Sequence, residues 1–125
     1  MQVIKTIKIT EEMVNTFAEL TGDKNPIHLN EDYAKTTKFG KRIVHGMLVS
    51  SFISKIIAMD YPGNGSIYVK QDLNFLHPCF IGDELKYVIT DIAVDGVKYT
   101  LSTKVYKDDL CILDGSCFVI KKWNI

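Results

Sequence analysis

The sequence predicts an α+β fold in which a curved antiparallel sheet wraps a long, buried helix. Residues 45 to about 60 form the strongest helical segment, and their apolar side chains cover nearly every face of a helix. From Gly65 onward, apolar and polar residues alternate with a period of two, which is typical of strands with one buried face. A helix that is apolar all round can be buried by a following antiparallel sheet only if the sheet curls around it.

The first elements are a predicted strand and a predicted amphipathic helix. Val3, Ile7 and Ile9 have spacings compatible with a strand. Thr10 precedes two acidic residues, as at the start of a helix. Gly22 stands where helices commonly end. One face of this helix is predicted to carry four apolar residues: Met13, Val14, Phe17 and Leu20.

Residues 22 to 28 are predicted to form a tight, non-helical loop. Pro26 supports this prediction because it disfavours helical geometry at the preceding residue, Asn25. Asn30 then offers an N-cap for a short helix that runs through roughly Thr36.

The second half of the chain is predicted to be a meander of antiparallel strands. Asp95-Gly96 separates two alternating segments, and this turn chemistry favours a hairpin. The last strand is expected over residues 110 to 120, with Gly115 as a candidate bulge or point of close approach. The alternating apolar residues of the meander are Ile67, Val69, Leu73, Phe75, Leu85, Tyr87, Ile89, Val97, Tyr99, Leu101 and Val105.

Length and charge restrict the range of partners. A chain of 125 residues lies within the usual range for one domain, so residues 1–125 are expected to form a single domain. Fifteen basic and fifteen acidic residues give a formal net charge of zero. This balance gives no electrostatic footprint for nucleic acid or for an anionic membrane surface. We therefore expect small molecules or other subunits as partners.

Neither a signal peptide nor a membrane span is expected. Lys5 and Lys8 interrupt the N-terminal apolar stretch, and the apolar stretch from Met47 to Met59 is interrupted and too short to cross a bilayer. The protein is therefore expected to stay in the cytoplasm. The cysteines have neither CxxC spacing nor a paired histidine spacing, which argues against disulfides and zinc. We expect no metal site, and the cysteines are interpreted as buried apolar side chains or surface thiols: Cys79, Cys111 and Cys117.

Asp23 and His28 are the candidate chemical groups. They are five positions apart, so a regular helix would not place them on one face, but the loop containing Gly22 and Pro26 can bring them together. They can then hold one water between them. At neutral pH an ordinary aspartate is ionised and an ordinary histidine is mostly neutral, so the pair can act as a base. Without further context, such residues are more often a turn former and a solvated imidazole.

The segment around this pair closely resembles the hydratase signature of the MaoC-like family, which includes the (R)-specific enoyl-CoA hydratases. The signature has an aromatic residue, here Phe17, then Leu20-Thr21-Gly22-Asp23-Lys24-Asn25-Pro26-Ile27-His28, then Ala34. Two further blocks agree with such enzymes: Ile43-Val44-His45-Gly46-Met47-Leu48, and Gly65-Ser66-Ile67-Tyr68 through Phe75 to Phe80-Ile81-Gly82-Asp83-Glu84. The resemblance therefore covers most of the chain, in order.

The resemblance implies a hot-dog fold, in which an antiparallel sheet wraps a helix. It also implies a homodimer or a dimer of dimers that takes an acyl-CoA or acyl-carrier-protein thioester near the subunit interface. Asp23 and His28 would be the catalytic pair. They would direct water to the β-carbon and return a proton to the α-carbon on the same face, giving a 3-hydroxyacyl thioester of R configuration. The reaction is reversible and needs no bound cofactor.

Three further residues are candidates for substrate binding. The N–H of Gly46 lies at the start of the long helix, where unsatisfied amides and the helix dipole favour an oxyanion; the alternative is a glycine needed for close packing. Asn25 would orient the pair or the substrate, or it is a turn-forming residue before Pro26. Ser54 matches a serine of similar enzymes that would face the pocket, or it bonds to its own helix.

Several other residues have simpler interpretations. His45 is interpreted as a residue that starts or packs the helix, and His77 as a loop imidazole. Lys41 and Arg42 could meet phosphates of the carrier arm, but two exposed charges usually form a solvated surface. Two other functions remain open: a hot-dog thioesterase, and a subunit that binds acyl thioesters without catalysis.

Overall fold

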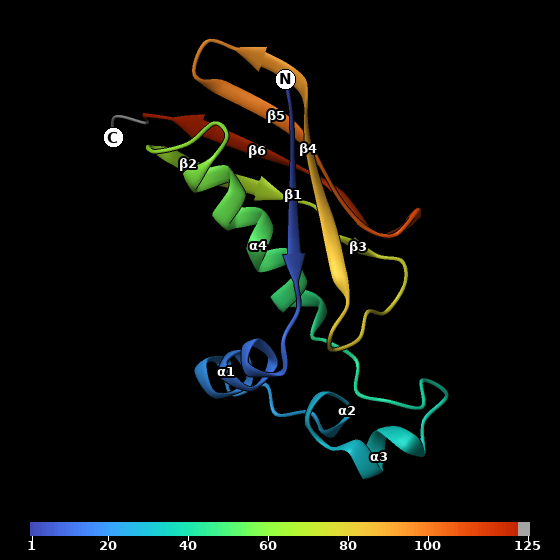
Figure 1. The fold of residues 1–125 in the computed structure, drawn as a ribbon. Helices are drawn as coiled ribbons and strands as arrows, with labels where there is room; N and C mark the ends of the chain where they lie inside the picture. The colour runs from blue at the N-terminus through green and yellow to red at the C-terminus, as the bar shows by residue number, and fades with distance from the viewer. Residues whose placement is uncertain (123–125) are drawn as a thin grey trace.

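The computed structural model describes residues 1–122, in which a six-stranded antiparallel sheet wraps one side of a long helix (Figure 1). The strand order is β1-β4-β5-β6-β2, and β3 also pairs with β6. This is the predicted hot-dog arrangement. The strands are β1 (Gln2–Lys8), β2 (Ser66–Gln71), β3 (Asn74–Phe75), β4 (Glu84–Asp95), β5 (Lys98–Lys107) and β6 (Leu110–Lys121).

The long helix α4 spans Gly46–Met59, close to the predicted range, and supplies the centre of the core. The phenol of Tyr87 on β4 donates a hydrogen bond to the carbonyl of Val49 at 2.7 Å, which ties the helix to the sheet. Burial of large apolar side chains contributes about 1.5–3 kcal/mol each. The helix buries five such side chains: Leu48, Val49, Ile53, Ile56 and Ile57.

The other face of α4 is exposed, which differs from the expectation of a helix buried on every side. The sheet is open and covers the helix from one side only (Figure 1). Met47 is 57% exposed for this reason. The exposed residues follow the helical repeat along one stripe: Met47, Ser51, Ser54, Lys55 and Met59.

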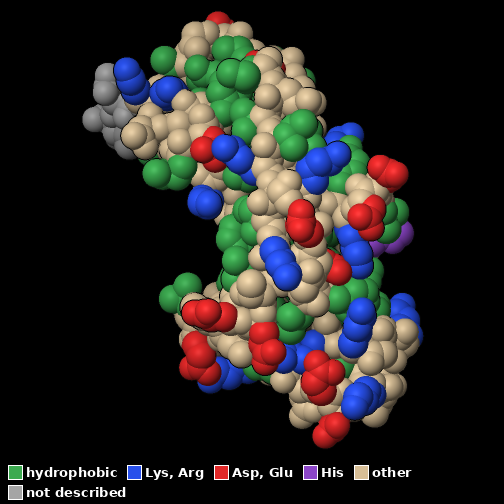
Figure 2. Space-filling model, in the orientation of Figure 1, with side chains coloured by type: hydrophobic (Ala, Val, Ile, Leu, Met, Phe, Trp, Pro, Cys, Tyr) green, Lys and Arg blue, Asp and Glu red, His purple; other side chains and the backbone are tan. Residues whose placement is uncertain are grey.

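Three short helices lie together beyond the end of the sheet, next to the first turn of α4 (Figure 1). They are α1 (Glu11–Thr21), α2 (Pro26–Leu29) and α3 (Glu31–Lys35). Figure 2 shows an indentation between this helical part and the sheet, with hydrophobic side chains in it. Thr10 and Asn30 cap α1 and α3 as predicted, since their side chains accept hydrogen bonds from the N–H groups of Met13 and Tyr33.

The predicted apolar face of α1 was wrong at Leu20, which is 83% exposed. The buried positions are Val14 and Ala18, four residues apart on the side that meets the core. Gly115 is confirmed as a point of close approach, because a Cβ there would overlap the carbonyl oxygen of Asp72. It is not a bulge: it pairs with Thr103, and the register shift of β5 and β6 lies further along.

No helix of residues 1–122 is long and apolar enough to cross a membrane.

Candidate active site

Asp23 lies in a short loop that begins where α1 ends. Gly22 adopts φ +80° and its N–H bonds the carbonyl of Ala18, which closes the helix as predicted. The N–H of Asp23 then donates to the Thr21 hydroxyl at 3.2 Å, and Asp23 Oδ1 accepts from the N–H of Asn25 at 3.4 Å. These short-range bonds turn the chain and leave the Asp23 carboxylate exposed.

His28 lies on α2, and this element corrects the predicted loop. Residues 22–25 are non-helical, but Pro26–Leu29 form one helical turn. Proline fits the first position of a helix, where its missing N–H is not needed. Asn25 Oδ1 caps this turn by accepting from the N–H of Ile27 at 3.3 Å. Asn25 thus has the turn-forming contact that its position before Pro26 allowed.

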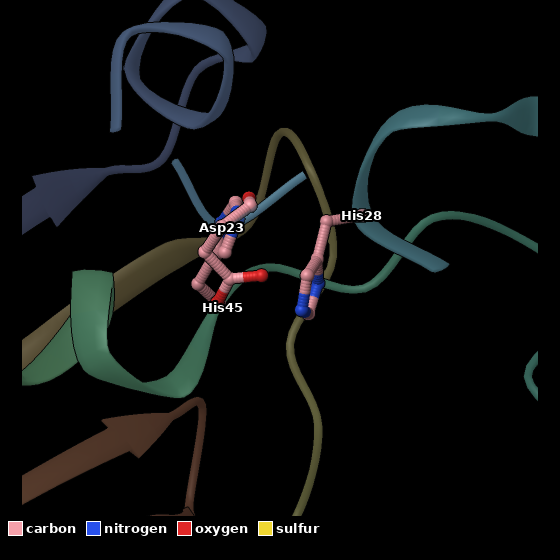
Figure 3. Close-up of side chains that lie close together, drawn as sticks. All are labelled: Asp23, His28 and His45. Atoms are coloured by element: carbon pink, nitrogen blue, oxygen red, sulfur yellow. The ribbon is translucent and has the colours of Figure 1, made fainter. Parts of the chain in front are cut away.

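The loop and the turn bring Asp23 and His28 together, and His45 joins them. The nearest nitrogen and oxygen atoms of these three side chains all lie within 4.8 Å of one another. In Figure 3 the Asp23 carboxylate points toward the His28 ring. The approach of Asp23 and His28 that the sequence predicts is therefore present in the structure.

The hydrogen bonding of His28 defines its tautomer. Its Nδ1 lies 2.8 Å from the carbonyl oxygen of Ile43, which can only accept, so Nδ1 carries the hydrogen of the neutral ring. Nε2 then has a free lone pair. The pKa of His28 is lowered from its ordinary value, mainly because burial disfavours the charged ring. The hydrogen bond to Ile43 and the negative charge of Asp23 raise the pKa of His28, and the electrostatic interaction with His45 lowers it.

His45 was predicted to start or pack the helix, and both descriptions are confirmed, but its contacts with the pair were missed. It occupies the N-cap position of α4, is 2% exposed, and has Nε2 3.0 Å from the carbonyl oxygen of Asp23. Its ring stacks on His28 with centroids 4.0 Å apart. The sequence block that contains His45 resembles the family, but no spacing rule predicts that His45 contacts Asp23, which lies 22 positions earlier.

The expectation that Arg42 is a solvated surface charge was wrong. Arg42 is 6% exposed, and its Nε donates to the carbonyl of His28 at 2.6 Å. The rest of the guanidinium reaches Glu11 and Asn15 on α1, at 3.4 and 3.2 Å. Arg42 therefore holds α1 and α2 together and is not directed toward a ligand.

A cavity of about 510 Å³ opens beside His28 and the first turn of α4. Most of its lining is apolar, and Lys38 and His77 add basic groups. Gly46 also lines it, and its N–H belongs to the first helical turn, where no intrahelical acceptor is available. A Cβ on Gly46 would lie 2.7 Å from the ring of Phe75, so glycine also permits this close packing. Both interpretations of Gly46 are compatible with the geometry.

Ser54 lies at a second cavity, of about 440 Å³, between α4 and β2. This cavity contains neither Asp23 nor His28 in its lining, but Met47 lines both cavities. The exposed face of α4 thus extends from the His28 cavity to Ser54. Ser50 and Ser51 donate their hydroxyls to the carbonyl of Met47, whereas the Ser54 hydroxyl makes no hydrogen bond within residues 1–122.

The spacing of Asp23, His28 and His45 is one at which three side chains can hold a metal ion. The two imidazoles are unsuited to this, because their planes differ by only 29° and stacked rings direct their lone pairs side by side instead of toward one point. One nitrogen of each ring also already contacts a carbonyl. We interpret the group as an acid–base site.

The three cysteines are free, as expected. Cys79 lines the His28 cavity, but burial raises the pKa of its thiol to about 12. It is therefore a protonated, apolar wall at neutral pH and no nucleophile.

A hot-dog sheet with an Asp–His pair at the start of the central helix has the architecture expected of the MaoC-like hydratases. Residues 1–109 match the model of the MaoC like domain, so the chain belongs to the MaoC-like family. The predicted family is confirmed.

The relatives of the chain are hydratases and dehydratases, which are hydro-lyases. It is 39% identical to a 3-hydroxybutyryl-CoA dehydratase of Methylorubrum extorquens over 114 residues, 90% of this chain and 73% of that protein. It is 49% identical to an (R)-specific enoyl-CoA hydratase of Rhodospirillum rubrum over 82 residues, 66% of this chain and 57% of that protein. The solved (R)-hydratase of Aeromonas caviae superposes with a TM-score of 0.93 at 33% identity, covering 97% and 94% of the two chains.

Proposed function

We propose that this protein is a hydro-lyase that reversibly adds water to a trans-2-enoyl thioester and forms an (R)-3-hydroxyacyl thioester. Asp23 and His28 are the catalytic pair. The observation that carries the proposal is the approach of an exposed carboxylate to an imidazole with a free Nε2, at the edge of an apolar cavity. The hydratases and dehydratases among its relatives support the same reaction.

In the hydration direction, the pair holds one water against the β-carbon. Nε2 of His28 accepts one hydrogen of the water, and the Asp23 carboxylate takes the proton that leaves as the new C–O bond forms. The electron pair of the double bond moves toward the thioester carbonyl. The proton held by Asp23 then passes to the α-carbon on the same face. Water has been added across the double bond and both residues regain their starting states.

The charge that develops on the thioester oxygen needs a hydrogen-bond donor. In the proposal, the N–H of Gly46 is this donor, because it lies at the positive end of the α4 dipole and lines the His28 cavity. Asn25 holds the loop between the two catalytic residues. Ser54 lies further along the exposed face of α4, where it can contact the acyl part of the substrate.

We further propose that the substrate is carried on coenzyme A or on an acyl carrier protein, that the enzyme works in the cytoplasm, and that it is a homodimer. The relatives include enzymes named for each carrier: an enoyl-CoA hydratase and a 3-hydroxyacyl-[acyl-carrier-protein] dehydratase. The dimer is supported by the exposed stripe of α4 and by the adjoining edge strand β2.

The proposal is tested with trans-2-enoyl-CoA substrates of short and medium chain length. The absorbance of the conjugated thioester should fall with the wild-type protein. Asp23→Asn and His28→Ala should each lower turnover by roughly 10²–10⁴, the usual contribution of a positioned acid or base. Asp32→Asn, an equivalent change of an exposed carboxylate on α3, is the matched control and should leave turnover unchanged.

Three results would contradict the proposal. Release of free thiol from a substrate whose double bond is still present would identify a thioesterase. Binding of acyl-CoA without turnover by the wild-type protein would identify a non-catalytic subunit. Near wild-type turnover by folded Asp23→Asn and His28→Ala proteins would remove the pair from the mechanism.

A further inference from the structure

We propose that His45 is a positioning residue for Asp23 and His28, and that it holds the backbone of the first and the ring of the second. The inference rests on the proposed catalytic role of that pair. His45 is the residue through which the loop after α1 and the turn α2 both meet the start of α4.

The first contact is the hydrogen bond to Asp23. Nε2 of His45 lies 3.0 Å from the Asp23 carbonyl, so the neutral ring carries its hydrogen on Nε2. Because Asp23 is exposed and its loop has only short-range bonds, this buried donor is a long-range anchor for its backbone. The anchor fixes the point from which the carboxylate extends toward His28.

The second contact is the stacked ring. The imidazoles of His28 and His45 have centroids 4.0 Å apart and planes inclined by 29° (Figure 3). Phe17 of α1 packs on His45 with a centroid separation of 4.9 Å. The bond from Nδ1 to Ile43 fixes one edge of the His28 ring, and the flat surface of His45 restricts its tilt. Together these contacts determine where Nε2 of His28 points.

The cost of an imidazole at this position supports a role beyond packing. Nδ1 of His45 is buried and has no hydrogen-bond partner within the described residues. An unsatisfied buried polar atom destabilises the folded state, whereas a phenylalanine or leucine would fill the space without this cost. What an apolar residue cannot provide is the N–H that reaches Asp23.

The charged groups around the two rings come from several elements. Asp23 faces both rings from the loop, and Arg42 contacts the His28 carbonyl from the segment before α4. Lys38 and His77 line the cavity on the substrate side of His28. A change at His45 leaves these charged groups in place, so a change in kcat without a change in KM reports the positions of Asp23 and His28.

Two substitutions separate the contacts of His45. His45→Phe keeps a stacking ring and loses the donor, and His45→Gln keeps an N–H near the place of Nε2 and loses the ring. We expect His45→Phe to lower kcat about 10²-fold with little change in KM, since misplacing a reacting group by about 1 Å can cost this much. His45→Gln should recover part of the rate.

The decisive comparison repeats His45→Phe in the His28→Ala protein. If His45 acts through the pair, the second substitution should add little to the loss, because residues that act as a unit are non-additive. Equal losses in both backgrounds would show a structural role, and wild-type kcat in folded His45→Phe and His45→Gln would also overturn the proposal. If either of these results is found while Asp23→Asn and His28→Ala remain inactive, the proposal for His45 is wrong and the proposed roles of Asp23 and His28 still stand.

A measurement on the wild-type protein covers the case in which the variants do not fold. Imidazole ¹⁵N chemical shifts report which nitrogen carries the hydrogen. We expect the Nε2–H tautomer for His45 and the Nδ1–H tautomer for His28. The Nδ1–H tautomer at His45 would exclude the bond to Asp23 and overturn the proposal, whatever the activity of the catalytic variants.

Discussion

The Nδ1 atom of His28 lies 2.8 Å from the carbonyl oxygen of Ile43, and this contact orients the imidazole and leaves its Nε2 free. Ile43 stands three residues before α4, and its own N–H donates to the carbonyl of Ile27 at 3.2 Å. The two bonds join α2 to the segment that leads into α4. The ring of His28, the proposed catalytic histidine, is thus fixed relative to the Gly46 amide, the proposed oxyanion donor.

The pH dependence should reflect the burial of His28. Because its pKa lies below the ordinary value of 6.5, the neutral ring, whose Nε2 can accept a hydrogen bond from water, persists as the pH falls through 6.5. We expect the acid limb of kcat/KM against pH to have an apparent pKa below 6.5. This limb should be absent from the residual rate of His28→Ala. An acid limb above 6.5 in the wild-type protein would contradict this assignment.

The double variant Asp23→Asn/His28→Ala should be little slower than either single variant. In the proposed mechanism the two groups hold the same water, so removing one already removes most of what the other contributes. Rates are measured on trans-2-enoyl-CoA after circular dichroism has shown that all three proteins fold. If the losses multiply, the two residues act in separate steps.

Gly46→Val should reduce turnover by about 10²–10³ and reduce stability less, because a β-branched side chain obstructs the approach of the thioester oxygen to the amide. Phe75 allows a test of whether Gly46 is needed as an oxyanion donor or for close packing. The ring of Phe75 lies where the new Cβ would be. In a Phe75→Ala background the steric conflict is relieved. Turnover should stay low there; recovery of turnover would show that glycine serves only the packing.

Gly115→Ala should destabilise the sheet by about 1–3 kcal/mol, the usual cost of overpacking. A Cβ at this position would overlap the carbonyl of Asp72, a backbone group in the link between β2 and β3 whose own N–H is held by the carbonyl of Ser116 at 2.8 Å. Ser116→Ala, at the next position of β6, is the control, because it loses only a 3.4 Å contact with the Asp72 carboxylate. Urea denaturation measures both, and equal stabilities would contradict the close approach.

Val69→Lys should weaken the proposed homodimer. Val69 is 48% exposed and lines the cavity between β2 and the exposed face of α4, where the partner is expected. Ile92→Lys is the control, since Ile92 is 60% exposed on β4, away from this face. Sedimentation velocity should show dissociation of the first variant only. A wild-type protein that is monomeric and fully active at all concentrations would rule out the dimer.

Much of the fold could be predicted because local signals agreed with one another. Period-two alternation, the Asp95-Gly96 turn and the capping residues Thr10 and Asn30 each act over a few positions, and the structure contains each of them. The predicted loop over residues 22 to 28 extends past the proline and so misses the single helical turn at Pro26–Leu29. Proline restricts the residue before it and is well suited to the first helical position.

The site was predicted less completely, for a physical reason. Asp23 and His28 lie within one loop and one turn, so a short sequence pattern contains both. The burial of Arg42 and the contacts of His45 depend on how α1 and α2 pack against the start of α4. Such contacts join residues 14 to 31 positions apart, and no local periodicity encodes them.

The pairing of β1 with β4 has a consequence for synthesis of the chain. Gln2 lies opposite Thr90, and their side chains bond across a separation of 88 residues. A ribosome releases the first strand long before its partner exists, so the edge of the sheet stays open while α4 emerges with its apolar side chains uncovered. Folding can therefore finish only late in translation, and the interval before β4 appears is when the nascent chain is most open to aggregation and to chaperones.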